Sequence, residues 1–221
     1  MERYYDILTA CDLFAGLNSD EIKTTLACFG AKKKTYRKGQ FIIEEGSAAD
    51  NFGIVLEGAV QIEKVDFYGN RTIVAKIMPS QIFGESFACA GIKTVPVNAV
   101  AAEDTTVLIV NCRKAVTPCA KLCGFHTKII HNLLRVVAQK NIVFNRKIEI
   151  TSRRTTREKL MAFLMLEAKQ NNSRSFYIPY DRQELADFLE VDRSGLSSEI
   201  GKLIKEGVIE SKKNYFRILD I

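Results

Sequence analysis

Short stretches that alternate apolar and polar residues dominate the first half of the chain, after one short helical segment at 20–28. Residues 59–65 and 71–78 alternate in this way, as the two faces of a half-buried strand require. Gly69-Asn70 between them is typical of a tight hairpin turn. The remaining strand-like runs are 41–43, 52–56, 97–101 and 105–110. Short strands at this spacing, with no helix-length period between them, predict an all-β barrel or roll.

A long helix follows, from His126 to about Thr151, in which apolar residues recur at alternating intervals of four and three. The stripe consists of Ile130, Leu134, Val137, Asn141, Phe144 and Ile148. We expect it to be the seam of a homodimer, with the polar Asn141 fixing register at some cost in stability. Ile129, Leu133, Val136 and Val143 widen the stripe, so one flank is expected to pack on the β-roll. An amphipathic core helix within a monomer is the alternative.

The last part of the chain has the start and stop signals of a helix-turn-helix. Thr155-Thr156-Arg157-Glu158 is a capping box that opens one helix, and Asp181-Arg182-Gln183-Glu184 opens a second. A turn at 190–192 leads into a third helix, 193–206, which Gly207 ends. A hairpin with the basic turn 211–214 follows. A helix-turn-helix with such a hairpin is a winged DNA-binding domain, whose second helix enters a major groove.

The charge distribution agrees with a nucleic-acid partner for the second half. Residues 1–110 carry 11 Lys and Arg against 14 Asp and Glu, whereas residues 111–221 carry 21 against 12. A basic second half that follows a mildly acidic first half favours binding of a polyanion. The alternative is that the excess of Lys and Arg only keeps the surface solvated. No apolar run approaches the ~20 residues that span a bilayer. The N-terminus lacks the apolar core of a signal peptide, so we expect a cytoplasmic protein with no membrane partner.

At both ends the chain resembles the Crp/Fnr superfamily of transcriptional regulators. The matching segments are Lys38-Gly39-Gln40, Glu45-Gly46, Val55-Leu56-Glu57-Gly58-Ala59-Val60, Gln81-Ile82-Phe83-Gly84-Glu85, Arg182-Gln183-Glu184-Leu185-Ala186 and Val191-Asp192-Arg193-Ser194. The resemblance implies an α+β protein in three parts. They are a double-stranded β-helix (jelly roll) sensor domain of the cyclic-nucleotide-binding type at 1–125, a dimerisation helix and hinge at 126–152, and a winged helix-turn-helix domain at 153–221. It also implies a non-enzymatic homodimer that binds double-stranded DNA, responds to an effector and works with RNA polymerase.

The resemblance places an effector pocket after Gly84-Glu85, but one departure argues against cyclic AMP. Family members that bind cyclic nucleotides carry Arg-Ser about ten residues later, where the guanidinium meets the cyclic phosphate. Val95-Pro96 stands there in this chain, and an unneutralised buried phosphate would cost several kcal/mol. Glu85 has an alternative role as a satisfied carboxylate in a structural turn. The residues expected to line this pocket are Gly84, Glu85, Ser86, Val95, Pro96, Ile142 and Val143.

The chemistry of the predicted recognition helix assigns roles to its side chains. Arg193, at its start, can donate to guanine O6 and N7, although a surface salt bridge is an alternative. Ser194, Ser197 and Ser198 are expected to contact bases or phosphates, Gln183 a phosphate, and Lys202, Lys212 and Lys213 to supply charge or merely solvation. The family's usual reading set is Arg, Glu and Arg, of which only Arg193 is present. The operator is therefore expected to differ from the common family palindrome.

The sequence shows no secretion signal, so its six cysteines are not expected to form a disulfide framework. Cys119, Cys123 and His126 lie at i, i+4 and i+7, with Cys112 nearby, so a metal or redox sensor is an alternative to a packed core. A thiol-dependent enzyme would need Cys119 or Cys123 as nucleophile and His126 as base. The sequence offers no nucleophile elbow or Gly-rich phosphate loop to support one. The pattern assigns no cofactor and names no effector.

Overall fold

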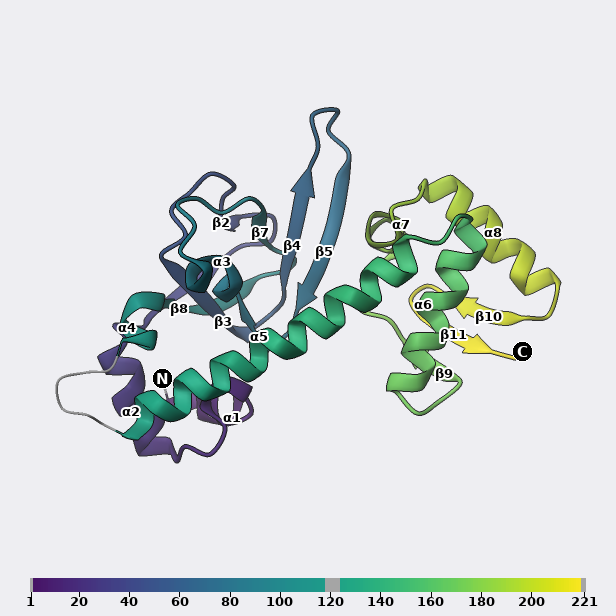
Figure 1. Ribbon diagram of the computed structural model, residues 1–221. Coiled ribbons are helices and arrows are strands. Elements are labelled where there is room, and N and C mark those ends of the chain that lie inside the picture. Colours follow the sequence, from purple (N-terminus) through teal and green to yellow (C-terminus); the bar gives the residue numbers. More distant parts are fainter. Residues whose placement is uncertain (1, 118–123, 220–221) are drawn as a thin grey trace. The chain divides into compact units, whose positions relative to one another are not determined.

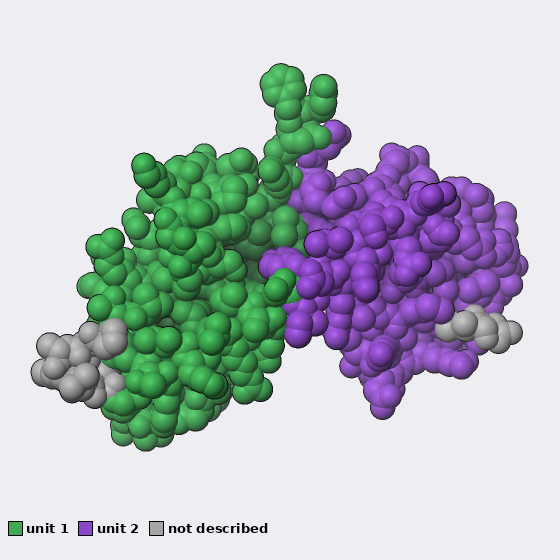
Figure 2. Space-filling view, viewed as in Figure 1, with its two compact units in different colours: residues 1–68, 74–141 green, residues 69–73, 142–221 purple. Residues whose placement is uncertain are grey.

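The computed structural model describes residues 2–117 and 124–219, which divide into two units (Figure 2). Residues 1–68 and 74–141 belong to the first unit, and residues 69–73 and 142–221 belong to the second. The division falls inside the long helix α5 (Gly124–Thr151), which the helical period predicts almost to the residue (Figure 1). The predicted domain boundaries at 125/126 and 152/153 stay a prediction, because α5 contributes to both units.

Two four-stranded sheets form the β-roll, in the orders β1-β8-β3-β6 and β2-β7-β4-β5. The strands are β1 (Lys32–Tyr36), β2 (Phe41–Ile43), β3 (Asn51–Glu57), β4 (Val60–Val65), β5 (Arg71–Ile77), β6 (Ile82–Phe83), β7 (Asn98–Ala101) and β8 (Thr105–Asn111). β8 pairs antiparallel with both β1 and β3, and β7 pairs antiparallel with both β2 and β4. The six strand-like runs in the sequence are all strands, whereas β1 and β6 were not expected.

Side chains from both sheets meet in one core, which is why the sheets pack face to face. Val55, Phe83 and Val107 of the first sheet are buried together with Val60, Ile77 and Ala99 of the second. Gly53 in β3 makes the packing possible, because a Cβ there would lie 2.1 Å from the Phe83 ring. The predicted β-roll within an α+β fold is confirmed.

Short helices and the first half of α5 build a second core against the roll. They are α1 (Tyr5–Thr9), α2 (Ser19–Cys28), α3 (Glu85–Ala90) and α4 (Cys112–Val116), with 3-10 turns at Glu2–Tyr4 and Asp12–Phe14. Ile129, Leu133 and Val136 of α5 are buried in this core, which confirms the expected packing flank. Val143 belongs to the second unit and is 55% exposed, so its packing on the roll stays a prediction.

Beyond residues 69–73 and the C-terminal part of α5, the described residues of the second unit form three further helices and a small sheet. These elements are α6 (Thr156–Gln170), β9 (Ser175–Tyr177), α7 (Arg182–Leu189), α8 (Arg193–Lys205), β10 (Ile209–Lys212) and β11 (Tyr215–Ile218). The sheet order is β10-β11-β9. The capping boxes at Thr155 and Asp181 both form, so α6 and α7 begin where the sequence places them. The basic turn is shorter than predicted, because 211 and 212 belong to β10.

Among the described residues, none of the helices combines the length and the apolar character needed to cross a bilayer.

Candidate functional site

Helix α8 has both buried and solvent-exposed side chains. Leu196, Ile200 and Leu203 are buried in the domain core. Ala186 of α7 is fully buried in the same core, and its small side chain suits the close packing of α7 and α8. Arg193, Ser197 and Ser198 of α8 are exposed. Three of the predicted DNA-contacting side chains are therefore open to solvent, with Arg193 in the first turn of the helix.

The first turn of α8 is held by its N-cap. The Asp192 carboxylate accepts a hydrogen bond from the Gly195 N–H at 2.8 Å, and the Ser194 hydroxyl also donates to it. These donors lower the pKa of the Asp192 carboxyl, with the Ser194 hydroxyl contributing most. The cap fixes the start of α8, where Arg193 projects. The Ser194 hydroxyl is engaged in the cap in this structure, and its predicted contact with DNA stays a prediction.

Arg182, which was not expected to be a site residue, lies where α7 meets the wing formed by β10 and β11. Its Nη2 lies 3.4 Å from the Ser211 hydroxyl and 3.4 Å from the Lys213 carbonyl oxygen, both acceptors. Its guanidinium lies 5.6 Å from the centre of the Phe216 ring. Burial and the nearby charge of Arg193 lower the pKa of Arg182. Its Nη1 is buried with no hydrogen-bond partner, so this side chain carries unneutralised positive charge beside the wing turn.

The other predicted phosphate contacts lie around the same helices. Gln183 is exposed in the first turn of α7, and its Nε2 donates to the Asp187 carboxylate at 2.7 Å. Lys212 and Lys213 are exposed on the wing, and Lys213 has a φ of +56° that shapes the two-residue turn. The structure thus places these side chains on α7 and on the wing, the elements that flank α8 in the sequence.

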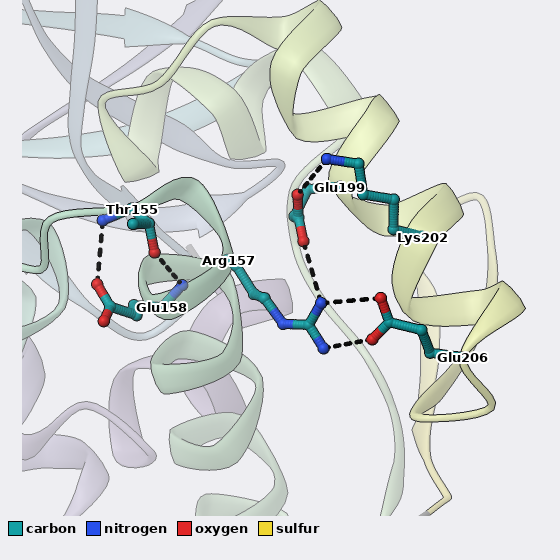
Figure 3. Close-up of polar contacts among 6 residues, drawn as sticks. All are labelled: Thr155, Arg157, Glu158, Glu199, Lys202 and Glu206. Carbon is teal, nitrogen blue, oxygen red and sulfur yellow. Dashed lines mark hydrogen bonds and ion pairs between the residues drawn. The ribbon is translucent and has the colours of Figure 1, made fainter.

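An ionic network fixes α8 to α6 and involves one of the predicted contacts (Figure 3). Arg157 of α6 donates to the Glu206 carboxylate, with 3.0 Å between Nη1 and Oε1, and lies 3.5 Å from Glu199. Lys202 in turn lies 3.2 Å from the other Glu199 oxygen. Lys202 is therefore partnered by a carboxylate, which weakens its expected role as a free cation. The Thr155–Glu158 capping box is also visible in Figure 3.

The predicted effector segment begins at a glycine turn. Gly84 has a φ of +81°, and a Cβ there would lie 3.1 Å from Ile43, so glycine suits both the backbone and the space. Glu85, the next residue, is only 1% exposed. Its Oε1 lies 2.8 Å from the Lys140 ammonium of α5 and accepts from the Ser86 hydroxyl at 3.3 Å. Its Oε2 is buried without a hydrogen-bond partner, so the carboxylate is only half satisfied.

The remaining predicted pocket residues are distributed more widely. Val95 is buried, and its N–H and C=O both bond to the 46–47 segment, at 2.9 and 2.8 Å. Pro96 is exposed. Ile142 and Val143 are about half exposed and belong to the second unit. The participation of these four residues in one pocket stays a prediction.

The predicted dimer seam is uncovered in the single chain. Leu134 and Ile148 are 68% and 62% exposed, Ile130, Asn141 and Phe144 are also exposed, and Val137 is half-buried. Exposed apolar residues aligned along one helix are typical of a surface that a partner covers. A different face of α5, with Ile129, Leu133 and Val136, packs in the core.

The described cysteines make two contacts that the sequence did not predict. Cys112 begins α4, and its Sγ lies 3.4 Å from that of Cys89. This hydrogen bond lowers the pKa of Cys112 and raises that of Cys89. His126 is buried, with Nε2 4.0 Å from Cys28 Sγ and its ring edge-on to Phe29. Cys119 and Cys123 lie outside the described residues. Within 2–117 and 124–219, no group of three or more His, Cys, Asp or Glu side chains is arranged to hold a metal ion.

A groove that was not expected from the sequence lies within the second unit, between the C-terminal part of α5 and α6. It combines apolar side chains, including Ile150, Met161 and Met165, with charged ones such as Arg146 and Glu149. It is separate in sequence from the Gly84–Ser86 segment.

Comparisons with known proteins identify both parts of the chain. The family model for the cyclic nucleotide-binding domain matches residues 33–115, and that for the Crp-like helix-turn-helix domain matches residues 158–221. The transcriptional activator protein FnrL of Cereibacter sphaeroides is 24% identical over 185 residues, which cover 80% of this chain and 71% of that protein. The cyclic AMP receptor protein of Thermus thermophilus is 25% identical over 198 residues, which cover 89% and 87%.

The chain is also similar in fold to solved structures at low sequence identity. The c-di-GMP responsive global regulator CLP of Xanthomonas campestris superposes with a TM-score of 0.75 at 14% identity, and the match covers 92% of this chain and 100% of that one. This likeness concerns the fold alone.

Proposed function

Because this chain belongs to the Crp/Fnr family of transcriptional regulators, we propose that it binds a specific DNA duplex as a homodimer, under the control of an effector other than cyclic AMP. Members of the family act as dimers, and the exposed seam of α5 is the surface that we assign to the partner copy. RNA polymerase is the further partner that we expect for such a regulator. The effector acts, in this proposal, through the β-roll.

One observation carries the DNA-binding part of the proposal, namely the open face of α8. Arg193 stands at the N-terminal end of a helix whose other face is buried and whose start is fixed by Asp192. A major groove admits an α-helix, and an Arg at its leading end can donate two hydrogen bonds to guanine O6 and N7. To Arg182 and the wing lysines we assign contacts with the phosphates beside that groove.

The exclusion of cyclic AMP rests on the chemistry of Val95. Its apolar side chain is buried and its backbone groups bond to the 46–47 segment, so the position offers neither a cation nor a free N–H to a phosphate. The Xanthomonas regulator responds to c-di-GMP whereas the Thermus relative is a cyclic AMP receptor. Related chains thus serve more than one ligand.

Signal transmission is proposed to run through Glu85 and Lys140. An effector group bound beside Glu85 would compete with the Lys140 ammonium and alter the contact between α3 and α5. Because α5 also carries the seam, this competition would favour one of two arrangements of the dimer over the other. Linkage then requires that operator DNA change effector affinity by the same factor by which the effector changes DNA affinity.

The test of the DNA-binding function is selection of duplexes from a random pool, with the small-molecule fraction of a cell extract present. We expect the full chain to enrich an inverted repeat, because a two-fold symmetric dimer reads symmetric half-sites. The Arg193→Ala variant should enrich the motif much more weakly, and Arg174→Ala, which removes an exposed charge before β9, should enrich it as the wild type does. Failure of the wild type to enrich any motif would overturn the proposal.

Thermal unfolding with added cyclic AMP tests the effector part separately. A ligand that binds only the folded state raises the Tm, so we expect no shift at millimolar cyclic AMP. A concentration-dependent rise would contradict the exclusion while leaving the DNA-binding function intact.

A further inference from the structure

Two cysteine side chains lie in contact at a place that the proposed function does not use. The Sγ atoms of Cys89 and Cys112 are 3.4 Å apart, although the residues are separated by 22 others in the sequence. Cys89 lies near the end of α3 and is exposed, whereas Cys112 begins α4 and is buried. One thiol is therefore open to solvent, and the other stands directly behind it.

We propose that Cys89 and Cys112 form a reversible intramolecular disulfide and make this site a redox-sensitive modification site of the protein. The sulfur atoms must approach by about 1.4 Å, to the ~2.05 Å of a disulfide. Both residues lie at helix ends, where small side-chain rotations and a slight shift of α3 can close such a gap.

The chemistry balances with a peroxide as oxidant. The thiolate of one of the two cysteines attacks one oxygen of hydrogen peroxide, the O–O bond breaks, and that cysteine becomes a sulfenic acid as one water leaves. The sulfur of the other cysteine then attacks the sulfenic sulfur, the S–O bond breaks, and a second water leaves as the disulfide forms. The two thiols supply two electrons and two protons in all, and a small dithiol restores them by exchange.

The other described cysteines have different surroundings. Cys11 is buried, and burial raises the pKa of its thiol to about 11. Cys28 is exposed, and the group beside its sulfur is the His126 ring rather than a second thiol. Cys28 therefore provides a matched control, because it has similar access to oxidant without an adjacent thiol partner.

The position of the proposed crosslink gives it a consequence for α3. This helix has only six residues, and Glu85 at its first position is held by Lys140. A disulfide at Cys89 would hold its other end to α4, so both ends of α3 would be restrained. Oxidation should therefore raise the Tm by a few degrees, because the crosslink lowers the conformational entropy of the unfolded chain.

Peptide mapping of the full chain after treatment with hydrogen peroxide tests the proposal directly. Trypsin cleaves after Lys76, Lys93 and Arg113, so Cys89 and Cys112 fall in adjacent peptides, 77–93 and 94–113, with one cysteine in each. We expect a linked pair lighter than the sum of the two peptides by two hydrogens, which disappears on reduction. The uncleaved peptide 77–113 is lighter than that sum by one water and is thereby distinguished.

Two variants complete the test. Cys89→Ser should abolish the linked pair, and Cys28→Ser should retain it in the wild-type amount. The wild-type map alone decides the matter if Cys89→Ser fails to fold. Links from Cys89 or Cys112 to other cysteines, oxidation of Cys89 to a sulfinic acid without a link, or retention of both free thiols would each overturn the proposal.

Discussion

The Lys140 ammonium lies 2.8 Å from the buried Glu85 carboxylate and 2.5 Å from the Ile82 carbonyl oxygen. This one side chain of α5 therefore neutralises the first residue of α3 and holds the strand that precedes it. Any change at Glu85, whether by a ligand or by mutation, must alter the contact of α3 with the long helix. The pair is thus the physical basis for the proposed path from effector to dimer.

Replacement of Lys140 should be costly, because it leaves the Glu85 charge buried without its partner. We expect Lys140→Met to lower the free energy of unfolding by about 3 kcal/mol, measured by urea denaturation. Adding Glu85→Gln should recover part of that loss. Arg135→Met, which removes an exposed cation from the same helix, should change stability by less than ~0.5 kcal/mol. If Lys140→Met and Arg135→Met lowered the free energy of unfolding equally, this account of the Lys140–Glu85 pair would be contradicted.

The exposed seam of α5 predicts that a charge placed there will separate the protomers. Leu134→Glu should convert the dimer to a monomer in sedimentation velocity, because two like charges would face each other across a two-fold axis. Gln139→Glu introduces the same charge on the opposite side of α5 and should leave the dimer intact. A wild type that sediments as a monomer, or a Leu134→Glu variant that still dimerises, would rule out this seam.

The wing lysines should contribute to DNA affinity through counterion release. Each phosphate neutralised adds about 0.9 to the slope of log affinity against log salt. We expect the double variant Lys212→Gln with Lys213→Gln to reduce that slope by about 2 per protomer, and to weaken selected and scrambled duplexes by similar factors. A slope that is unchanged would show that these lysines only solvate the wing.

Cys11 should make the protein sensitive to alkaline pH. The pKa of its thiol is about 9 in the unfolded chain, and burial raises it to about 11 in the folded protein. Between pH 9 and 11 the folded state therefore binds the thiol proton more tightly than the unfolded state does. The neutral Cys11 thiol thus contributes fully to the free energy of unfolding below pH 9, and this contribution is lost as the pH rises to about 11. Cys11→Ala should unfold with a shallower loss of stability between pH 9 and 11 than the wild type does. Identical pH profiles would show that burial does not perturb this thiol.

Local sequence signals located most of the elements. The capping boxes at Thr155 and Asp181 satisfy backbone N–H groups within four residues, so they place helix starts without reference to the rest of the fold. The period of α5 and the alternation of β4 and β5 are equally local. The exposed face of α8 followed from the same periodicity, and with it the placement of Arg193.

The features that the sequence did not reveal depend on contacts between distant residues. Strand β1 contains three consecutive exposed lysines and pairs only with β8, as suits the edge of a sheet, so no apolar alternation marks it. Lys140 meets Glu85 across 54 intervening residues, and Cys89 meets Cys112 across 22. Arg157 and Glu206 resemble ordinary surface charges until the helices are packed. Only the fold brings these pairs together.

Arg193 provides the most direct test of the DNA-binding claim, through fluorescence anisotropy with the selected duplex and a scrambled duplex of equal length. The wild type should bind the selected duplex at least a thousandfold more tightly at physiological salt, within the ~10³–10⁷ range of specific binders. Arg193→Ala should reduce that ratio about tenfold to a hundredfold with an unchanged Tm, and Arg174→Ala should preserve it. Equal affinity of the wild type for both duplexes would contradict the account.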